Sequence, residues 1–196
     1  MIRWLAVRHG ESEWNVEGRI QGQRSGVPLT ARGRAQAHAA ASQLMAQSVD
    51  RIVSSDLERA RATAAIIADA LARPVEFTPA LREQALGSLE GRLASELAAE
   101  PVPDGVDITE VRWGGGESVA DVHARLRAFV AAVEQDTVRG TVLVVAHEGT
   151  IQVLRAVLAG RGHRDVAWDR VTPGEIVDLD TQPGCGNESR TPVGSS

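Results

Sequence analysis

The sequence lacks the features that define several large classes of protein. It has one cysteine, Cys185, so no disulfide can form within the chain, and this usage is typical of a reducing compartment. Its longest apolar run, near Val142, is far shorter than a bilayer span. The N-terminus has no basic region followed by a long apolar stretch, so we expect no signal peptide. These absences predict a soluble, cytoplasmic protein that does not contact membranes.

Basic residues are also too few for a typical nucleic-acid-binding protein. There are 21 Lys and Arg against 26 Asp and Glu, a net charge of −5, so we expect no nucleic-acid partner. No repeat of solenoid type is present. The 196 residues, of which 43% are hydrophobic and 24% charged, predict one globular domain over 1–180 with its own core. Residues 181–196, rich in Gly, Ser, Pro and Thr, are expected to form a disordered tail.

Short apolar runs alternate with helical patterns along the rest of the chain. Strands are expected in the apolar runs at Ile2–Val7, Ile52–Val53, Pro74–Phe77, Val142–Val145 and, at an edge of the sheet, Ile176–Leu179. Helices are expected after four capping residues, namely Thr30, Ser55 (with Glu58), Ser118 (with Asp121) and Thr150. The alternation predicts an α/β fold, a three-layer αβα sandwich around a mainly parallel sheet.

Three further expectations concern single segments of that fold. The apolar spacing after Thr30 predicts a helix whose inner face ends in Leu44 and Met45. The mixed polar segment 92–116 predicts a short cap or lid, partly helical near Leu93–Ala99. The long polar loop after the first strand, which ends at Pro28, is expected to be functional, because long loops inside compact domains usually are.

Two of the predicted strands end in a histidine that has a glycine close by. The first strand is followed by Arg8, His9 and Gly10, and the strand near Val142 is followed by His147. Ligands of open α/β sheets bind just past the carboxyl ends of the strands. Glycine at this place lets the backbone approach a neighbour closely or turn with positive φ. One such strand end is an ordinary polar turn, but two of them indicate a site.

The residue types at these ends suit a phosphomonoester. Arginine pairs with phosphate oxygens through two parallel donors, and Arg8 and Arg59 are the candidates. Arg59 falls in the first turn of a predicted helix, where anions bind, although taken alone it is more readily interpreted as a solvated surface arginine. Neutral His9 could attack phosphorus if a backbone carbonyl holds its other ring nitrogen. Glu83 could protonate the leaving alkoxide, while His147 and the arginines stabilise the charge on the phosphoryl oxygens.

Up to about Leu179 the chain resembles the histidine phosphatase superfamily, also called the phosphoglycerate-mutase-like family. The matching blocks occur in the family's order. They are Arg8-His9-Gly10-Glu11; Pro28-Leu29-Thr30 with Gly33 and Gln36; Ser54-Ser55-Asp56-Leu57 with Arg59-Ala60 and Thr63-Ala64; Leu81 and Glu83 with Gly87 to Gly91; and Gly116-Glu117-Ser118.

This resemblance implies a role for each matching residue. His9 would be the phosphorylated nucleophile, Glu83 the general acid and base, and Arg8, Arg59 and His147 the phosphate pocket. The resemblance implies no metal and no cofactor. Substrate binding is assigned to Ser12, Asn15, Gln21, Gly22 and Glu148. Three histidines match nothing and are expected on helix faces or the surface, namely His38, His123 and His163.

Three positions depart from the family's usual pattern and put the choice of substrate in doubt. Gly26 stands where an aspartate is common, and Ala146 stands where a serine often precedes the second histidine. Glu148 follows that histidine in place of a glycine. Its carboxylate could raise the pKa of His147, or it could repel acidic substrates if it faces the pocket.

The sequence therefore predicts a metal-independent phosphatase that hydrolyses a small phosphorylated metabolite. One alternative is a cofactor-dependent phosphoglycerate mutase, although mutases of the family generally have a longer cap after the Glu83 region. Another is a non-catalytic module that binds a phosphorylated ligand. The sequence does not name the substrate, and a homodimer through an apolar edge strand is left open. Three arginines could help to hold an acidic substrate but are more commonly solvated, namely Arg24, Arg82 and Arg112.

Overall fold

The computed structural model describes residues 2–98, 101–136 and 140–180, so the expected disordered tail, with Cys185, lies outside the described residues. Five strands form one sheet in the order β3-β2-β4-β1-β5. Four are parallel, namely β1 (Ile2–Arg8), β2 (Arg51–Ser55), β3 (Val75–Thr78) and β4 (Gly140–Ala146). The fifth, β5 (Ile176–Asp178), pairs antiparallel with β1 at one edge, as predicted.

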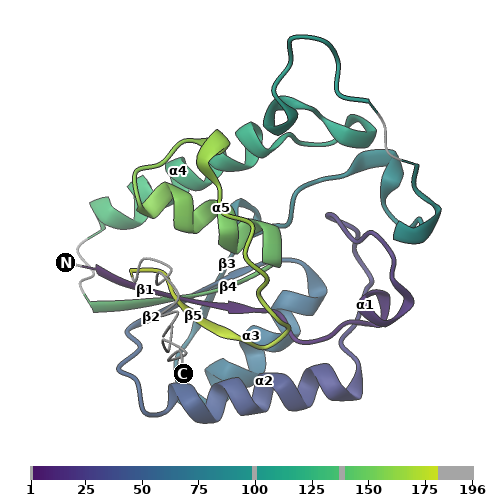
Figure 1. Ribbon diagram of the computed structural model, residues 1–196. Coiled ribbons are helices and arrows are strands. Elements are labelled where there is room, and N and C mark those ends of the chain that lie inside the picture. Colours follow the sequence, from purple (N-terminus) through teal and green to yellow (C-terminus); the bar gives the residue numbers. More distant parts are fainter. Residues whose placement is uncertain (1, 99–100, 137–139, 181–196) are drawn as a thin grey trace, which may run out of the picture.

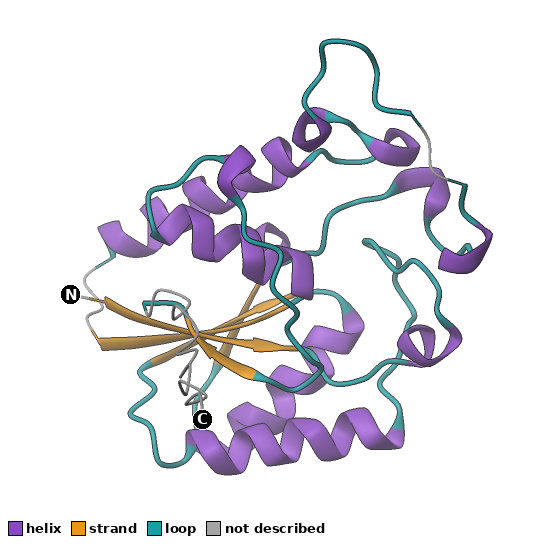
Figure 2. Ribbon diagram, viewed as in Figure 1, coloured by secondary structure: helices purple, strands orange, loops and turns teal. Residues whose placement is uncertain are grey.

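Helices cover both faces of this sheet. Figures 1 and 2 show α2 (Ala31–Leu44) and α3 (Glu58–Leu71) on one face, and α4 (Val119–Gln135) and α5 (Glu148–Leu158) on the other. Neighbouring residues of a strand point to opposite faces, so the strands need apolar residues at nearly every position. In β1, Leu5 packs into the core under α2 and α3, and Trp4 packs into the core under α4 and α5. The predicted three-layer αβα sandwich is confirmed.

Two predicted helix caps hold and two are wrong. The hydroxyl of Thr30 accepts a hydrogen bond from Gly33 N at 2.9 Å, and that of Ser118 accepts one from Asp121 N at 3.1 Å. Ser55 instead ends β2, and α3 begins at Glu58 after Leu57 without a side-chain cap. Because a capping bond contributes only about 1 kcal/mol, the pairing of a buried strand overrides it.

The second wrong cap is Thr150, which lies inside the first turn of α5, because His147 is the N-cap of that helix. The predicted inner face of α2 also ends one residue early. Leu44 is fully buried, whereas Met45 is 66% exposed at the end of the helix.

The segment between β3 and α4 extends beyond the sandwich (Figure 1). Within its described part the helical pieces are short 3-10 turns, so the helix expected near Leu93–Ala99 is reduced to Ala94–Glu96. The other 3-10 turns of this segment are η1 (Pro79–Leu81), η2 (Gly87–Leu89), η4 (Ile108–Glu110) and η5 (Trp113–Gly115). Two short elements lie elsewhere: the helix α1 (Glu13–Glu17) follows β1, and the turn η6 (His163–Asp165) follows α5. The loop after β1 pairs with this segment, because Ile20 N donates to Arg92 O at 2.9 Å and Gly91 N donates to Ile20 O at 2.8 Å.

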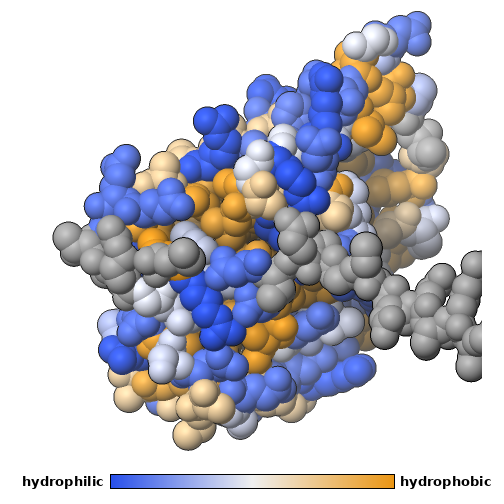
Figure 3. Space-filling model, turned by 60° about the vertical axis from the view of Figure 1, so that its left-hand side comes forward, coloured by the Kyte–Doolittle hydropathy of each residue, from blue (hydrophilic) through white to orange (hydrophobic). Residues whose placement is uncertain are grey.

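Apolar side chains reach the surface in the same segment. Figure 3 shows them gathered towards the top of the molecule, and the exposed apolar residues there are Val102, Val106 and Ile108. A hollow of about 450 Å³ beside them is lined in part by Leu89, Leu97 and Trp113. Across the described residues, no helix has both the length and the hydropathy that a membrane span requires.

Candidate active site

The two strand-end histidines meet because β1 and β4 are neighbours in register. Arg8 is the register partner of Ala146, and His9 N donates to Ala146 O at 2.9 Å. The residues that follow therefore leave the sheet side by side. The ring centroids of His9 and His147 are 5.1 Å apart, and both side chains are buried. The parallel pairing of β1 and β4 thus brings the two strand-end histidines into one place.

His9 is held in the tautomer that a nucleophile needs. Its Nδ1 lies 2.8 Å from Gly10 O. A carbonyl only accepts hydrogen bonds, so we assign the proton to Nδ1, which leaves the lone pair on Nε2. Burial first, and then the positive charges of Arg59 and Arg8, hold the pKa of His9 well below its ordinary value of 6.5. The imidazole is therefore neutral at neutral pH.

His147 is fixed by Ser55, whose spacing to Glu58 predicts a helix cap. Its Nε2 lies 2.9 Å from the hydroxyl of Ser55, while its Nδ1 is buried without a hydrogen-bond partner among the described residues. Burial, then Arg59 and His9, lower the pKa of His147 well below 6.5. The alternative that Glu148 raises the pKa of His147 is wrong, because the Glu148 carboxylate forms an ion pair with the guanidinium of Arg8 instead.

Arg59 is a buried arginine and not a surface one. It is the second residue of α3, with 1% of its surface exposed. Its Nη2 donates to Gly22 O at 2.8 Å and its Nη1 to Arg24 O at 3.3 Å, while Nε has no partner in the described part of the chain. Burial lowers the pKa of Arg59 to about 10, against the opposing attraction of Glu83 and Glu90. It therefore remains a cation at neutral pH, inside the protein.

Arg8, also in the pocket wall, is held by a carboxylate and a backbone carbonyl. Its Nη1 lies 2.5 Å from both Glu148 Oε2 and the carbonyl of Val171, and its buried Nε has no partner among the described atoms. Burial lowers the pKa of Arg8, and Glu148 and Glu83 partly oppose that shift. Both arginines thus retain donor atoms that nothing in the described chain satisfies, which is rare for buried polar groups.

The glycine after His9 is needed for close approach and not for positive φ. A Cβ on Gly10 would lie 2.2 Å from Gly33 O at the start of α2. Gly10 N donates to the hydroxyl of Thr63 at 3.0 Å, and that hydroxyl donates to Arg59 O at 2.8 Å. Thr63 therefore ties the strand carrying His9 to the helix carrying Arg59. The motif block contained Thr63, but no local pattern indicated this role.

Glu83 reaches the same edge of the sheet from the loop after η1. Its carboxylate accepts hydrogen bonds from Gln84 N at 3.0 Å, from Gly149 N at 3.2 Å and from the Thr150 hydroxyl at 3.3 Å. Two of these donors lie in the first turn of α5, directly after His147. The start of α5 therefore positions both the second histidine and the candidate acid.

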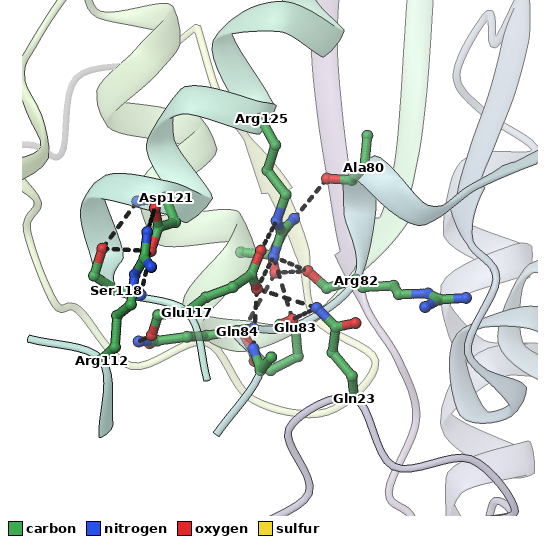
Figure 4. A network of polar contacts seen from close by, with 12 residues as sticks. Gln23, Ala80, Arg82, Glu83, Gln84, Arg112, Glu117, Ser118, Asp121 and Arg125 are labelled. Carbon is green, nitrogen blue, oxygen red and sulfur yellow. Dashed lines mark hydrogen bonds and ion pairs between the residues drawn. The ribbon is translucent and has the colours of Figure 1, made fainter. Parts of the chain in front are cut away.

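Figure 4 shows a polar network that holds the backbone around Glu83. The guanidinium of Arg125, on α4, donates to Ala80 O, Arg82 O and Glu83 O at 2.6, 2.7 and 3.2 Å. Glu117 pairs with Arg125 at 3.0 Å and also accepts from Ala85 N at 3.0 Å. Sequence reasoning missed Arg125, since its partners lie more than 40 residues away in the chain.

Arg8, His9, Arg59 and Glu83 line a pocket of about 270 Å³, whereas His147, which the family resemblance predicts to line it, is not in its wall. Its wall is formed by Arg8, His9, Arg19, Ile20, Gln21, Gly22, Arg59, Glu83, Gln84, Leu86, Glu148 and Gly149. Ser12 and Asn15, assigned to substrate binding from the motif, are not in that wall. The Ser12 hydroxyl is buried 2.9 Å from Asn15 Oδ1 and 3.0 Å from Gln21 Oε1, in the capping box of α1.

The other singled-out residues lie outside this pocket. Arg82 pairs with Asp56 at 2.6 Å, and Arg112 pairs with Asp121 at 2.8 Å. The Arg24 side chain is exposed, and its backbone carbonyl accepts a hydrogen bond from Arg59. His38 lies on the exposed face of α2, His123 contacts Arg161 O at 2.9 Å, and His163 contacts Glu110 at 3.3 Å. No group of three or more His, Cys, Asp or Glu that could hold a metal ion occurs within the described ranges.

A family model and a curated relative both match most of this chain. The family model described as histidine phosphatase superfamily (branch 1) matches residues 4–190. A Yersinia enterocolitica protein named "probable phosphoglycerate mutase GpmB" is 37% identical over 164 residues, which are 82% of this chain and 76% of that protein.

Solved structures with the same fold include two phosphatases. A mycobacterial glucosyl-3-phosphoglycerate phosphatase complexed with VO3 has a TM-score of 0.77 and 34% identity, over 89% of this chain and 90% of that one. The alpha-ribazole phosphatase of Shigella flexneri has a TM-score of 0.78 and 30% identity, over 89% and 88%.

Proposed function

The chain belongs to the histidine phosphatase superfamily, and from this premise we propose that it hydrolyses a small phosphorylated metabolite through a phosphohistidine on His9. The observation that carries the proposal is the neutral, Nδ1-protonated His9 beside His147 and the buried Arg59. A neutral imidazole with a free Nε2 is a nucleophile, and fixed cations around it can receive the negative charge of a phosphoryl group.

In the first step, His9 Nε2 attacks phosphorus and the bond from phosphorus to the ester oxygen breaks. Glu83, as the carboxylic acid, donates its proton to the leaving alkoxide. Arg8 and Arg59 in the pocket wall offset the charge on the remaining phosphoryl oxygens, and we assign the buried Nδ1 of His147, whose ring centroid is 5.1 Å from that of His9, to donate to one of them. This use of His147 requires the proton on Nδ1, so its Nε2 would accept from the Ser55 hydroxyl.

In the second step, water replaces the alcohol. The Glu83 carboxylate takes a proton from that water, its oxygen bonds to phosphorus, and the bond from phosphorus to His9 Nε2 breaks. The products are the alcohol and inorganic phosphate, and His9 returns to its neutral form. The positive charge that this chemistry needs comes from the protein's own arginines, so we propose that the reaction is independent of metal ions.

A phosphoglycerate mutase remains the second candidate, because curated relatives carry that name. It would use the same intermediate and return the phosphoryl group to the sugar acid. Incubation with 3-phosphoglycerate separates the two, because a mutase forms 2-phosphoglycerate and a phosphatase releases phosphate. A non-catalytic binding module is the third alternative, and the complete set of nucleophile, acid and cations argues against it.

The test is to trap the intermediate. We expect purified protein to hydrolyse p-nitrophenyl phosphate in the presence of EDTA, and His9→Ala to lose at least about a thousandfold in kcat, since removal of a covalent nucleophile typically costs that much or more. In Glu83→Gln the good leaving group still departs but water is not activated, so acid-labile phosphate should accumulate on residue 9.

The matched control is His38→Ala, which removes an exposed histidine of α2 and should retain full activity. Substantial turnover by His9→Ala, or labelling of another residue, would remove the assigned nucleophile. Activity lost in chelator and restored by zinc or magnesium would contradict metal independence.

A further inference from the structure

The pocket wall has few cations that could bind a second negative group of a substrate in addition to its phosphate. Its cations are Arg8, Arg19 and Arg59, and its carboxylates are Glu83 and Glu148. Among the described residues, the hydrogen bonds of Arg59 go to two backbone carbonyls and to no carboxylate, so its charge is left for the phosphoryl group. Arg8 also faces the phosphoryl group in the proposed mechanism, so a second anionic group of the substrate would depend on Arg19 and on whatever charge Arg8 has left.

Arg8 already has an anionic partner within the wall. Glu148 Oε2 lies 2.5 Å from its Nη1, and Val171 N donates to the other oxygen of Glu148 at 3.3 Å. The Glu148 side chain is 37% exposed and lies in the first turn of α5, where the helix dipole favours a carboxylate. Glu148 is therefore a fixed negative charge beside the phosphoryl site that offsets part of the charge of Arg8.

Arg19 is also occupied. Its Nε pairs with Glu17 at 2.5 Å and its Nη1 donates to Gly91 O at 2.8 Å. The remaining polar side chains of the wall, Gln21 and Gln84, are neutral. Apart from Arg59, each cation of the described wall thus already has a carboxylate partner. None of them is left unpaired for a second negative group of the substrate.

We infer that Glu148 makes this pocket select phosphate esters of uncharged or cationic alcohols and reject phosphorylated carboxylic acids. The inference rests on the proposed phosphatase function and names its substrate class. A carboxylate one or two carbons from the ester oxygen would enter the field of Glu148 without a cation of its own, and like charges a few ångströms apart repel each other. By this reasoning, the phosphoglycerate chemistry in the relatives' names does not transfer to this chain.

Two matched pairs of esters test the inference, because the members of each pair differ in a single carboxylate. Glycerol 3-phosphate is compared with 3-phosphoglycerate, and phosphoethanolamine with O-phosphoserine. For each ester we would measure kcat/KM by phosphate release, and Ki as a competitive inhibitor of p-nitrophenyl phosphate hydrolysis. In the wild type we expect the ester without the carboxylate to be favoured about tenfold or more in both pairs, the effect of roughly one unscreened charge pair.

The Glu148→Gln variant keeps the size of the side chain and an acceptor for Val171 N but removes the charge. We expect it to reduce that preference about tenfold, since one charge pair is lost. The control is Asp69→Asn, which removes one exposed charge ten residues after Arg59 on α3, about 15 Å along the helix, and should leave the preference unchanged. High salt should weaken the wild-type preference and leave that of Glu148→Gln unaltered, because ions screen such repulsion.

A wild type that prefers 3-phosphoglycerate and O-phosphoserine would overturn the inference, and so would a Glu148→Gln variant with the wild-type preference. The Ki values decide the matter even if none of the four esters turns over. Absence of p-nitrophenyl phosphate hydrolysis would instead remove the proposed function, so the two failures are distinguishable.

Discussion

At the scale of single residues, the two histidines of the pocket make folding depend on pH. Burial and Arg59 hold the pKa values of His9 and His147 well below 6.5 in the folded protein, whereas in the unfolded chain they return to about 6.5. Below pH 6.5 the unfolded chain therefore binds more protons than the folded one. The resulting stability is fully present above pH 6.5 and is lost as the pH falls towards the folded-state values.

We predict that the free energy of unfolding declines between pH 6.5 and 5, by up to about 1.4 kcal/mol per pH unit for each histidine. Urea denaturation at several pH values measures this slope. The double variant His9→Gln, His147→Gln should flatten it, whereas His38→Gln, at an exposed position, should keep it. An equal slope in the double variant would assign the pH dependence to other groups.

At the scale of elements, the pocket depends on how closely α2 approaches the end of β1. A Cβ on Gly33, in the first turn of α2, would lie 2.0 Å from the carbonyl oxygen of Glu11. Helix propensity alone predicts that Gly33→Ala stabilises the protein by about 1 kcal/mol. The backbone contact predicts the opposite sign, because neither the helix nor the strand end can yield locally, and overpacking typically costs about 1–3 kcal/mol.

We predict that Gly33→Ala lowers the free energy of unfolding and, by moving the segment that carries His9, reduces kcat. Ser42→Ala on the exposed face of the same helix is the matched control, and it should change stability by less than about 0.5 kcal/mol. Urea denaturation of both variants decides the sign. If Gly33→Ala were more stable than the wild type, the close approach of α2 to the Glu11 carbonyl would not require glycine at position 33.

At the scale of the whole molecule, the pocket joins all three layers of the sandwich. Arg8 and His9 come from the sheet, Arg59 from the helix layer on one face, and His147 and Glu148 from the start of α5 on the other face. If the pocket binds an anion as proposed, we expect that anion to hold these layers together. Ligand binding to the folded state alone raises the free energy of unfolding by about 2.7 kcal/mol when its concentration is a hundred times Kd.

We predict that inorganic phosphate or vanadate raises Tm in a single cooperative transition. Arg59→Met should lose most of this shift, because it removes the buried cation. Arg73→Met, which removes an exposed arginine beyond the end of α3, should retain it. An equal shift in both variants would place the bound anion elsewhere on the protein.

The part of the site formed by Arg8, His9 and His147 could be predicted because these residues lie at strand ends. The apolar runs before His9 and His147 define two neighbouring parallel strands, and parallel strands end at the same edge of a sheet. Local signals failed where long-range packing opposed them. Ser55 has the spacing of a helix cap, but it pairs as the last residue of β2 opposite Thr78 and is fully buried against His147.

The sequence by itself determined the two apolar faces of the sheet, the order of its strands and helices along the chain, and which residues have the chemistry for phosphoryl transfer. Only the tertiary structure decided the partners of the charged groups. Glu148 pairs with Arg8, which lies 140 positions away in the chain (148 − 8). Arg125 holds the backbone of Glu83, which lies 42 positions away (125 − 83). The physical reason is that apolar periodicity is a local property, whereas an ion pair needs only two groups a few ångströms apart in space, wherever they lie in the sequence.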